Sequence, residues 1–149
     1  GRKPLLYAGL IGMALSLGFL GLAFKIEAMG GALKIFAVLS VLVYIASFAV
    51  SLGPICWLII AEVYPLKVRG RAMSLATLSN WLFNFIVAST FLTLTEKMGK
   101  SGAFWLYGGV CLIGLVYTRF FVPETKGITL EDIEEHLRSG KALSRLGKA

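Results

Sequence analysis

Charged residues are scarce in this sequence, and four long stretches have almost none. Only 15% of the 149 residues are charged, whereas 57% are hydrophobic. Soluble globular domains carry about 25% charged residues, so this composition excludes an ordinary soluble domain. The apolar stretches cover residues 4–24, 35–61, 72–95 and 103–122. Because about 20 apolar residues cross the hydrocarbon core of a bilayer, we predict an all-α membrane protein with four transmembrane helices within residues 1–122.

Residues that bind metals or carry out catalysis are equally rare. The chain has one histidine and two cysteines, and Cys56 and Cys111 lie in different predicted spans without the spacing of a metal site. The predicted spans contain no pair of carboxylates and no activated nucleophile. We therefore expect no catalytic residue, no metal and no cofactor, and we predict that the chain is not an enzyme. Both cysteines are expected to be free, buried thiols.

The net charge is +7, and the positive residues are unevenly distributed. If the four spans alternate in direction, 11 of the 15 Lys and Arg residues fall on one side of the membrane. These are Arg2, Lys3, Lys67, Arg69, Arg71, Arg119, Lys126, Arg138, Lys141, Arg145 and Lys148. The positive-inside rule then places both ends in the cytoplasm of a multi-pass protein of a plasma membrane or a bacterial inner membrane. No basic stripe with interleaved aromatic residues indicates nucleic-acid binding, so the lipid bilayer is the expected partner of these charges.

The two ends of the sequence give further expectations. Residues 1–3 lead directly into the first span without a methionine, so we expect a piece of a longer protein whose missing N-terminal helices are its partners. The tail, residues 123–149, is predicted to hold a short amphipathic cytoplasmic helix. Thr129 is placed to cap this helix, with Asp132 at the capping-box position. Its apolar face, which includes Ile133, would dock on the membrane-embedded body or on lipid headgroups.

The first two spans carry small and hydroxyl residues at helical spacing. The first span has Gly9, Gly12, Gly18 and Gly21, which predict close packing against another helix. The second span places Ser40, Tyr44, Ser47 and Ser51 on one helical face. Two interpretations of this stripe stay open: hydrogen bonding between helices, or the wall of a hydrated path leading to Trp57.

A Gly-Pro pair interrupts the second span. Pro54 lacks an amide hydrogen and clashes with the carbonyl one turn earlier, so the helix is predicted to bend or unwind near Gly53. Within a membrane, such a break is tolerated only where the freed backbone groups face protein or a water-filled cavity. A broken span is therefore a pointer to a binding site.

The third span carries an amide-rich face. Asn80 and Asn84 follow helical spacing, with Trp81 at the edge of that face. Burying two carboxamides in a membrane without partners would cost several kcal/mol each, so they must have partners. A sugar would suit them, because carboxamides both donate and accept hydrogen bonds, and indoles such as Trp57 and Trp81 stack on apolar sugar faces.

Five stretches resemble one family in order and at its spacing. They are GRKPLL, GPICWLIIAEVYP, VRGRA, SNWLFNFIV and PETKG. Through them the chain resembles the sugar-porter family of the major facilitator superfamily over essentially its whole length. The resemblance implies the ninth to twelfth helices of a twelve-helix transporter, followed by the cytoplasmic tail helix.

The resemblance also implies roles for individual residues. Sugar contacts fall on Trp57, Asn80 and Trp81, with Asn84 one turn deeper and Phe48 and Gly53 beside them. Gly53 and Pro54 fall where the tenth helix flexes to gate the extracellular side. Arg2, Glu62 and Arg69 fall on a cytoplasmic charge network that biases alternating access.

We therefore expect a C-terminal fragment of a secondary transporter that moves a monosaccharide, a hexose or a pentose, by alternating access. The substrate is the expected small-molecule partner, and proton coupling stays open because no acidic residue lies within the spans away from their ends. One alternative is a polyol or inositol transporter of the same family. A second alternative, from another class, is a free-standing four-span membrane scaffold.

Overall fold

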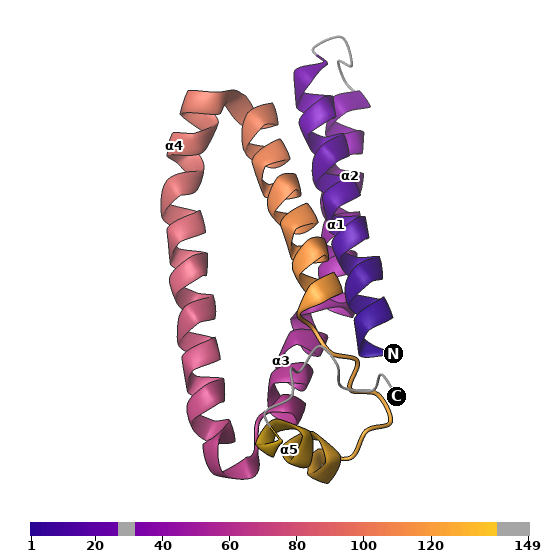
Figure 1. Cartoon of the computed structure of the whole chain (residues 1–149). Coiled ribbons are helices and arrows are strands. Elements are labelled where there is room, and N and C mark those ends of the chain that lie inside the picture. The colour runs from indigo at the N-terminus through magenta and orange to yellow at the C-terminus, as the bar shows by residue number, and fades with distance from the viewer. Residues whose placement is uncertain (27–31, 140–149) are drawn as a thin grey trace.

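A computed structural model describes residues 1–26 and 32–139 and shows five helices joined by short connections (Figure 1). They are α1 (Arg2–Lys25), α2 (Ala32–Val50), α3 (Leu52–Val63), α4 (Leu66–Phe120) and α5 (Leu130–Arg138). The residues described contain no strand. Three helical segments are long and apolar enough to cross a membrane: Arg2–Lys25, Leu33–Val63 and Leu66–Phe120. The expected all-α membrane architecture is therefore confirmed.

The longest helix, α4, turns back on itself at one residue. Gly99 has φ 73° and ψ 164°, and the rest of α4 is helical on both sides of it. This backbone conformation is open to glycine and strained for other residues, so a single residue suffices for the reversal. The sequence predicted a loop between residues 95 and 103, whereas both arms of α4, residues 66–98 and 100–120, extend up to Gly99. The third and fourth spans that the sequence predicts, residues 72–95 and 103–122, fall mainly in these two arms.

The connection before α4 is also shorter than the sequence indicated. VRGRA was expected in a loop, but α4 begins at Leu66, so this stretch forms its first turns. The amides of Val68 and Arg69 donate to the Pro65 carbonyl over 3.1 and 2.9 Å. Proline is compatible with a helix start because the first amides of a helix have no partner within it.

The break predicted in the second span lies at Ser51. This residue has φ −121° and ψ −91°, which is not helical, and it separates α2 from α3. Pro54 has no amide to donate to the carbonyl of Val50, and its ring would clash with that carbonyl. The helical hydrogen-bond pattern is therefore interrupted one turn before the proline. The amide of Ser51 donates instead to Phe48 O over 3.2 Å, and its hydroxyl to Ser47 O over 2.6 Å.

The first helix, α1, supplies most of the buried core and packs against both α2 and the second arm of α4 (Figure 1). Its buried face contains Leu6, Gly9, Leu10, Met13, Ser16, Leu17, Leu20, Gly21 and Ala23. A β-carbon at Gly9 would overlap the Ser51 side chain, and one at Gly21 would overlap Trp105. Gly12 faces Ser47 in the same way, whereas Gly18 has open space. The predicted packing role is confirmed for all of these glycines except Gly18.

Replacing Gly9 with valine should destabilise the protein strongly. The new side chain would collide with the Ser51 side chain and lie within 2.8 Å of the carbonyl oxygen of Ser47, which belongs to the α2 backbone. Overpacking of this kind costs roughly 1–3 kcal/mol. We expect a lower midpoint in thermal unfolding of the purified full-length protein, whereas G18V, which places the same side chain in open space, serves as the control. Equal stability of G9V and G18V would contradict this packing.

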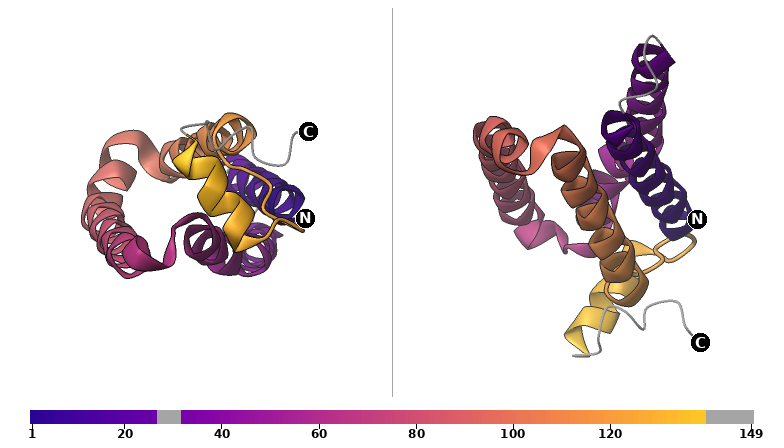
Figure 2. Two further views of the ribbon diagram at one scale, coloured as in Figure 1. Left: turned by 60° about the horizontal axis from the view of Figure 1, so that its bottom comes forward. Right: turned by 90° about the horizontal axis from the view of Figure 1, so that it is seen from above.

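The first arm of α4 stands apart from α1 and α2 in all views (Figures 1 and 2). Every residue from 77 to 90 is exposed. Many of these side chains are large and apolar, for example Phe83 at 66% and Phe85 at 68% exposure. Within a membrane, the faces of this arm that do not look toward α1 and α2 are therefore covered by lipid or by protein outside this chain.

Candidate functional site

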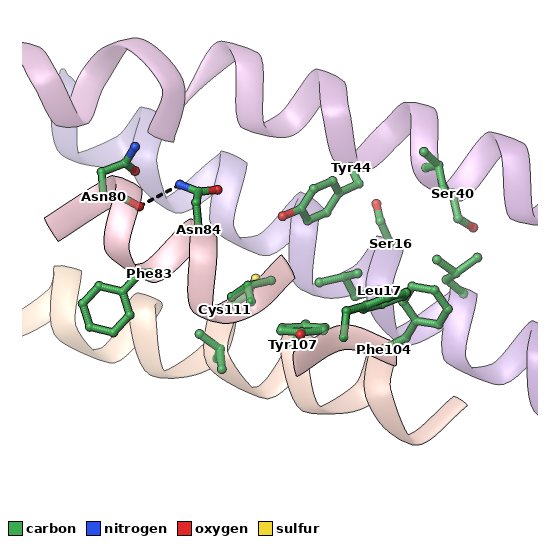
Figure 3. A pocket seen from close by; sticks show the side chains of 15 residues that line it. Ser16, Leu17, Ser40, Tyr44, Asn80, Phe83, Asn84, Phe104, Tyr107 and Cys111 are labelled. Carbon is green, nitrogen blue, oxygen red and sulfur yellow. Dashed lines mark hydrogen bonds between the residues drawn. The ribbon is translucent and has the colours of Figure 1, made fainter. Parts of the chain in front are cut away.

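The two arms of α4, together with α1 and α2, surround a cavity of about 490 Å³ (Figure 3). Its wall is mainly apolar, with a few polar side chains contributed by different helices. The polar residues are Ser16, Ser40, Tyr44, Asn80, Asn84 and Tyr107. Mostly apolar walls with a small number of placed polar groups are typical of small-molecule sites.

Two carboxamides from the first arm of α4 point into this cavity. The Asn84 side-chain nitrogen donates to the backbone carbonyl of Asn80 over 2.8 Å, the bond drawn in Figure 3. The Asn80 carboxamide forms no hydrogen bond with any residue that the structure describes. Its donor and acceptor are therefore available for a ligand.

Two phenols face the same cavity. Tyr44 reaches it from α2 and Tyr107 from the second arm of α4 (Figure 3). The Tyr107 hydroxyl is buried and has no hydrogen-bond partner within the described part of the chain. A buried hydroxyl without a partner costs free energy, so a ligand or a further helix that bonded it would gain stability. Sequence reasoning missed Tyr107; the available signal was a hydroxyl inside an otherwise apolar span.

The two indoles lie elsewhere. Neither Trp57 nor Trp81 lines the cavity: Trp81 is 68% exposed, and Trp57 is half-buried on α3. Successive residues on a helix differ by about 100°, so Trp81 cannot share the direction of Asn80, whereas Asn84 is only about 40° away. The structure thus brings Asn80 and Asn84 together and leaves both tryptophans outside this cavity.

Phe48 belongs to a second cavity of about 570 Å³, which also includes Cys56. Tyr44 and Cys111 line both cavities and so separate Phe48 from the asparagines. A β-carbon at Gly53 would lie 3.2 Å from the Phe48 carbonyl oxygen, so Gly53 permits this close contact at the helix break.

Both cysteines are free, as predicted, but Cys56 is exposed in this chain rather than buried.

The charged end of the bundle, defined by Arg2, Glu62 and Glu124, joins segments far apart in sequence. Arg2 Nη2 forms an ion pair with Glu62 Oε1, and the two side chains are 26% and 18% exposed. The third residue assigned to this network lies outside the pair, because Arg69 Nε donates to the Tyr64 carbonyl over 3.2 Å. Thr125 Oγ1 donates to Glu62 Oε2 over 2.5 Å.

Glu124 caps the start of α1. Its carboxylate accepts the amides of Arg2 over 2.9 Å and Lys3 over 3.2 Å, and that of Lys126 over 3.1 Å. Burial by itself raises the pKa of Glu124, but these amide hydrogen bonds outweigh it and lower the pKa. A lowered pKa means that the cap stabilises the fold above the unfolded pKa and is lost as pH falls through the folded one. Sequence reasoning missed this cap because its partners are 122 and 121 positions away.

The tail helix is capped as the sequence predicted. The Asp132 amide donates to Thr129 Oγ1 over 3.2 Å, and the Thr129 hydroxyl donates to the Asp132 carboxylate over 2.6 Å. Ile133 is 2% exposed and lies beside the corner between α3 and α4. The helix therefore docks on the protein body.

Across the described ranges, no three His, Cys, Asp or Glu side chains gather as a metal site requires.

Helices of membrane-spanning length around a mainly apolar cavity are typical of a multi-pass membrane protein. The family described as "Sugar (and other) transporter" matches residues 1–137. The chain belongs to this family, the sugar porters of the major facilitator superfamily, which confirms the resemblance found in the sequence.

Individual relatives agree with this assignment. Trehalose transporter 1 of Drosophila melanogaster is 44% identical over 140 residues, covering 92% of this chain and 16% of that protein. Facilitated trehalose transporter Tret1 of Drosophila yakuba is 46% identical over 140 residues, which again cover 92% of this chain and 16% of that protein. The inward-open structure of the xylose transporter XylE from E. coli matches with a TM-score of 0.82 at 41% identity, covering 91% of this chain and 30% of that one. This chain thus spans well under half of the length of these relatives.

Proposed function

We propose that this chain is part of a secondary transporter that carries a sugar across a membrane by alternating access. The observation that carries the proposal is the pair of carboxamides, Asn80 and Asn84, which face a mostly apolar cavity at the level of the membrane-spanning helices. Uncharged amides that both donate and accept hydrogen bonds suit a neutral ligand rich in hydroxyl groups. Membership of the sugar transporter family supports the same substrate class.

In this mechanism, the sugar binds against the first arm of α4 and the rest of its wall comes from helices outside this chain. The break at Ser51, together with Gly53 and Pro54, lets α2 move against α3 and close the extracellular side. The Arg2–Glu62 pair holds the opposite, cytoplasmic side and separates when that side opens. Binding and conformational bias are the only tasks in this scheme, so the proposed protein is a carrier and not an enzyme.

The proposal also includes the two indoles, which would contact the sugar where helices outside this chain complete the cavity wall. Neither Trp57 nor Trp81 lines the described cavity, and Trp81, which is 68% exposed, would be covered by helices outside this chain. A sugar held between the two halves of a transporter could then be stacked by indoles and hydrogen-bonded by Asn80. Phe48 and Gly53 would shape the neighbouring wall.

We propose a monosaccharide as the substrate, with a disaccharide as the second candidate. The relative of known structure is named for xylose, whereas the fly relatives are named for trehalose. The distribution of positive residues favours a cytoplasmic location for both termini of the fragment, in a plasma or bacterial inner membrane. Proton coupling would need a titratable group from outside this chain, because its spans hold no acidic residue away from their ends.

Uptake by the full-length protein in liposomes tests this proposal. We expect counterflow of radiolabelled glucose or xylose, inhibited by excess unlabelled monosaccharide and not by trehalose or inositol. Inhibition by trehalose would replace the monosaccharide with a disaccharide, and inhibition by inositol alone would favour the polyol alternative. Failure of every sugar and polyol to exchange would contradict the transport proposal itself.

A further inference from the structure

The tail segment, residues 123–138, contacts three helices at the charged end (Figure 1). Glu124 binds the first amides of α1, and Thr125 binds Glu62 at the end of α3. Farther along, Ile133 lies beside Val63 and Leu66, where α3 meets α4. The tail segment thus contacts the start of α1, the end of α3 and the start of α4.

The contact between Thr125 and Glu62 differs from the others in its geometry. Thr125 is 2% exposed, and its hydroxyl donates to Oε2 of Glu62 over 2.5 Å. The other oxygen of the same carboxylate, Oε1, accepts from Arg2. Each oxygen therefore has its own donor, and together the two donors fix the rotation of the carboxylate. A hydrogen bond to an ionised group is roughly twice as strong as one between neutral groups.

We propose that Thr125 is a positioning residue for Glu62: its hydroxyl holds the carboxylate in the orientation that pairs with Arg2, so the tail segment and the ion pair are coupled. By thermodynamic reciprocity, whatever strengthens the ion pair then also strengthens tail docking, and loss of either loosens the other. The gating role of the ion pair rests on the proposed function, whereas the coupling itself does not depend on any sugar.

The helix break gives this coupling a mechanical consequence. Because Ser51 is not helical, α3 can change its angle to α2, and Glu62 lies near the far end of α3. Such a movement would draw Glu62 away from Thr125 and remove part of the surface on which Ile133 rests. Release of the tail segment should therefore accompany opening of the charged end.

Hydrogen exchange of the tail segment in the purified full-length protein tests the coupling. T125V keeps the shape of the side chain and removes its donor, so exchange of the α5 amides should become roughly tenfold faster. T125S keeps the donor and should restore slow exchange. T118V is the control, because Thr118 is a similarly buried threonine, 5% exposed, that has no hydrogen bond to an acid in the described chain.

The decisive variant is R2Q, since the Arg2 side chain pairs with Glu62, whereas the hydrogen bond of Arg2 to the tail segment comes from its backbone amide, which the substitution keeps. Coupling predicts that R2Q also speeds exchange in α5, and that adding R2Q to T125V produces little further change. Unchanged exchange in R2Q, or fully additive effects in the double variant, would overturn the proposal. If T125V does not fold, R2Q alone decides. These outcomes are independent of transport, so a failure of the sugar proposal would be recognised separately by the uptake assay.

Discussion

Replacing Asn80 with leucine should weaken sugar binding by the full-length transporter roughly tenfold to a hundredfold, with little loss of protein stability. Leucine has nearly the same shape as asparagine but cannot donate or accept a hydrogen bond. A site built to bond a hydroxyl group loses about 1–3 kcal/mol when one partner is removed. Stability should hold because the Asn80 carboxamide has no partner in the described chain and lies on an exposed helix face. Isothermal titration or a radioligand binding assay measures the change.

Two further variants on the same arm of α4 show whether the effect is specific. N84L should weaken binding less than N80L, because the Asn84 side-chain nitrogen already donates to the Asn80 carbonyl. T90V should leave binding unchanged, since the Thr90 hydroxyl bonds Ile86 O over 2.7 Å and does not line the cavity. Wild-type affinity in N80L would show that Asn80 serves only helix packing in the whole protein.

Replacing Glu62 with glutamine should shift the conformational balance about tenfold and leave sugar affinity within a few fold. Glutamine retains the size of the side chain and an acceptor for Thr125, but it removes the charge that pairs with Arg2. A charged hydrogen bond exceeds a neutral one by about 1–2 kcal/mol, which corresponds to roughly a tenfold change in an equilibrium constant. The cytoplasmic side should therefore open more often.

Accessibility of the two sides of the transporter measures this shift, for example through the ratio of exchange to net flux. E96Q is the matched control, because Glu96 lies near the Gly99 turn and pairs with no residue that the structure describes. A loss of sugar affinity in E62Q without any change in that ratio would assign Glu62 to the binding site instead of the gate.

Much of the fold could be predicted from residue patterns because a bilayer imposes simple requirements. Runs of about 20 apolar residues must be helical there, and the proline rule located the break to within one turn of its position at Ser51. The reversal between residues 95 and 103 was predicted, but its restriction to Gly99 could not be, because the chain has 17 glycines and their local sequences do not tell which of them adopts positive φ. Gly18 shows the same limit, since its spacing matched the packing glycines although it faces open space.

For the candidate site, helical periodicity was enough to predict which side chains come together when they lie on the same helix. Asn80 and Asn84 lie four positions apart and do meet at the cavity. The contacts at the charged end needed the structure, because Thr125 and Glu62 are 63 positions apart and no local pattern relates them. The roles of Trp57 and Trp81 were predicted from the chemistry of indoles and from family resemblance, and they depend on helices outside this chain.

A structure of the full-length transporter with its sugar bound would test the central proposal most directly. We expect the Asn80 carboxamide within hydrogen-bonding distance of a sugar hydroxyl, and at least one of the two indoles stacked on the sugar ring. A sugar bound elsewhere, with Asn80 bonded to another helix of the protein, would contradict the assignment of this face to the substrate.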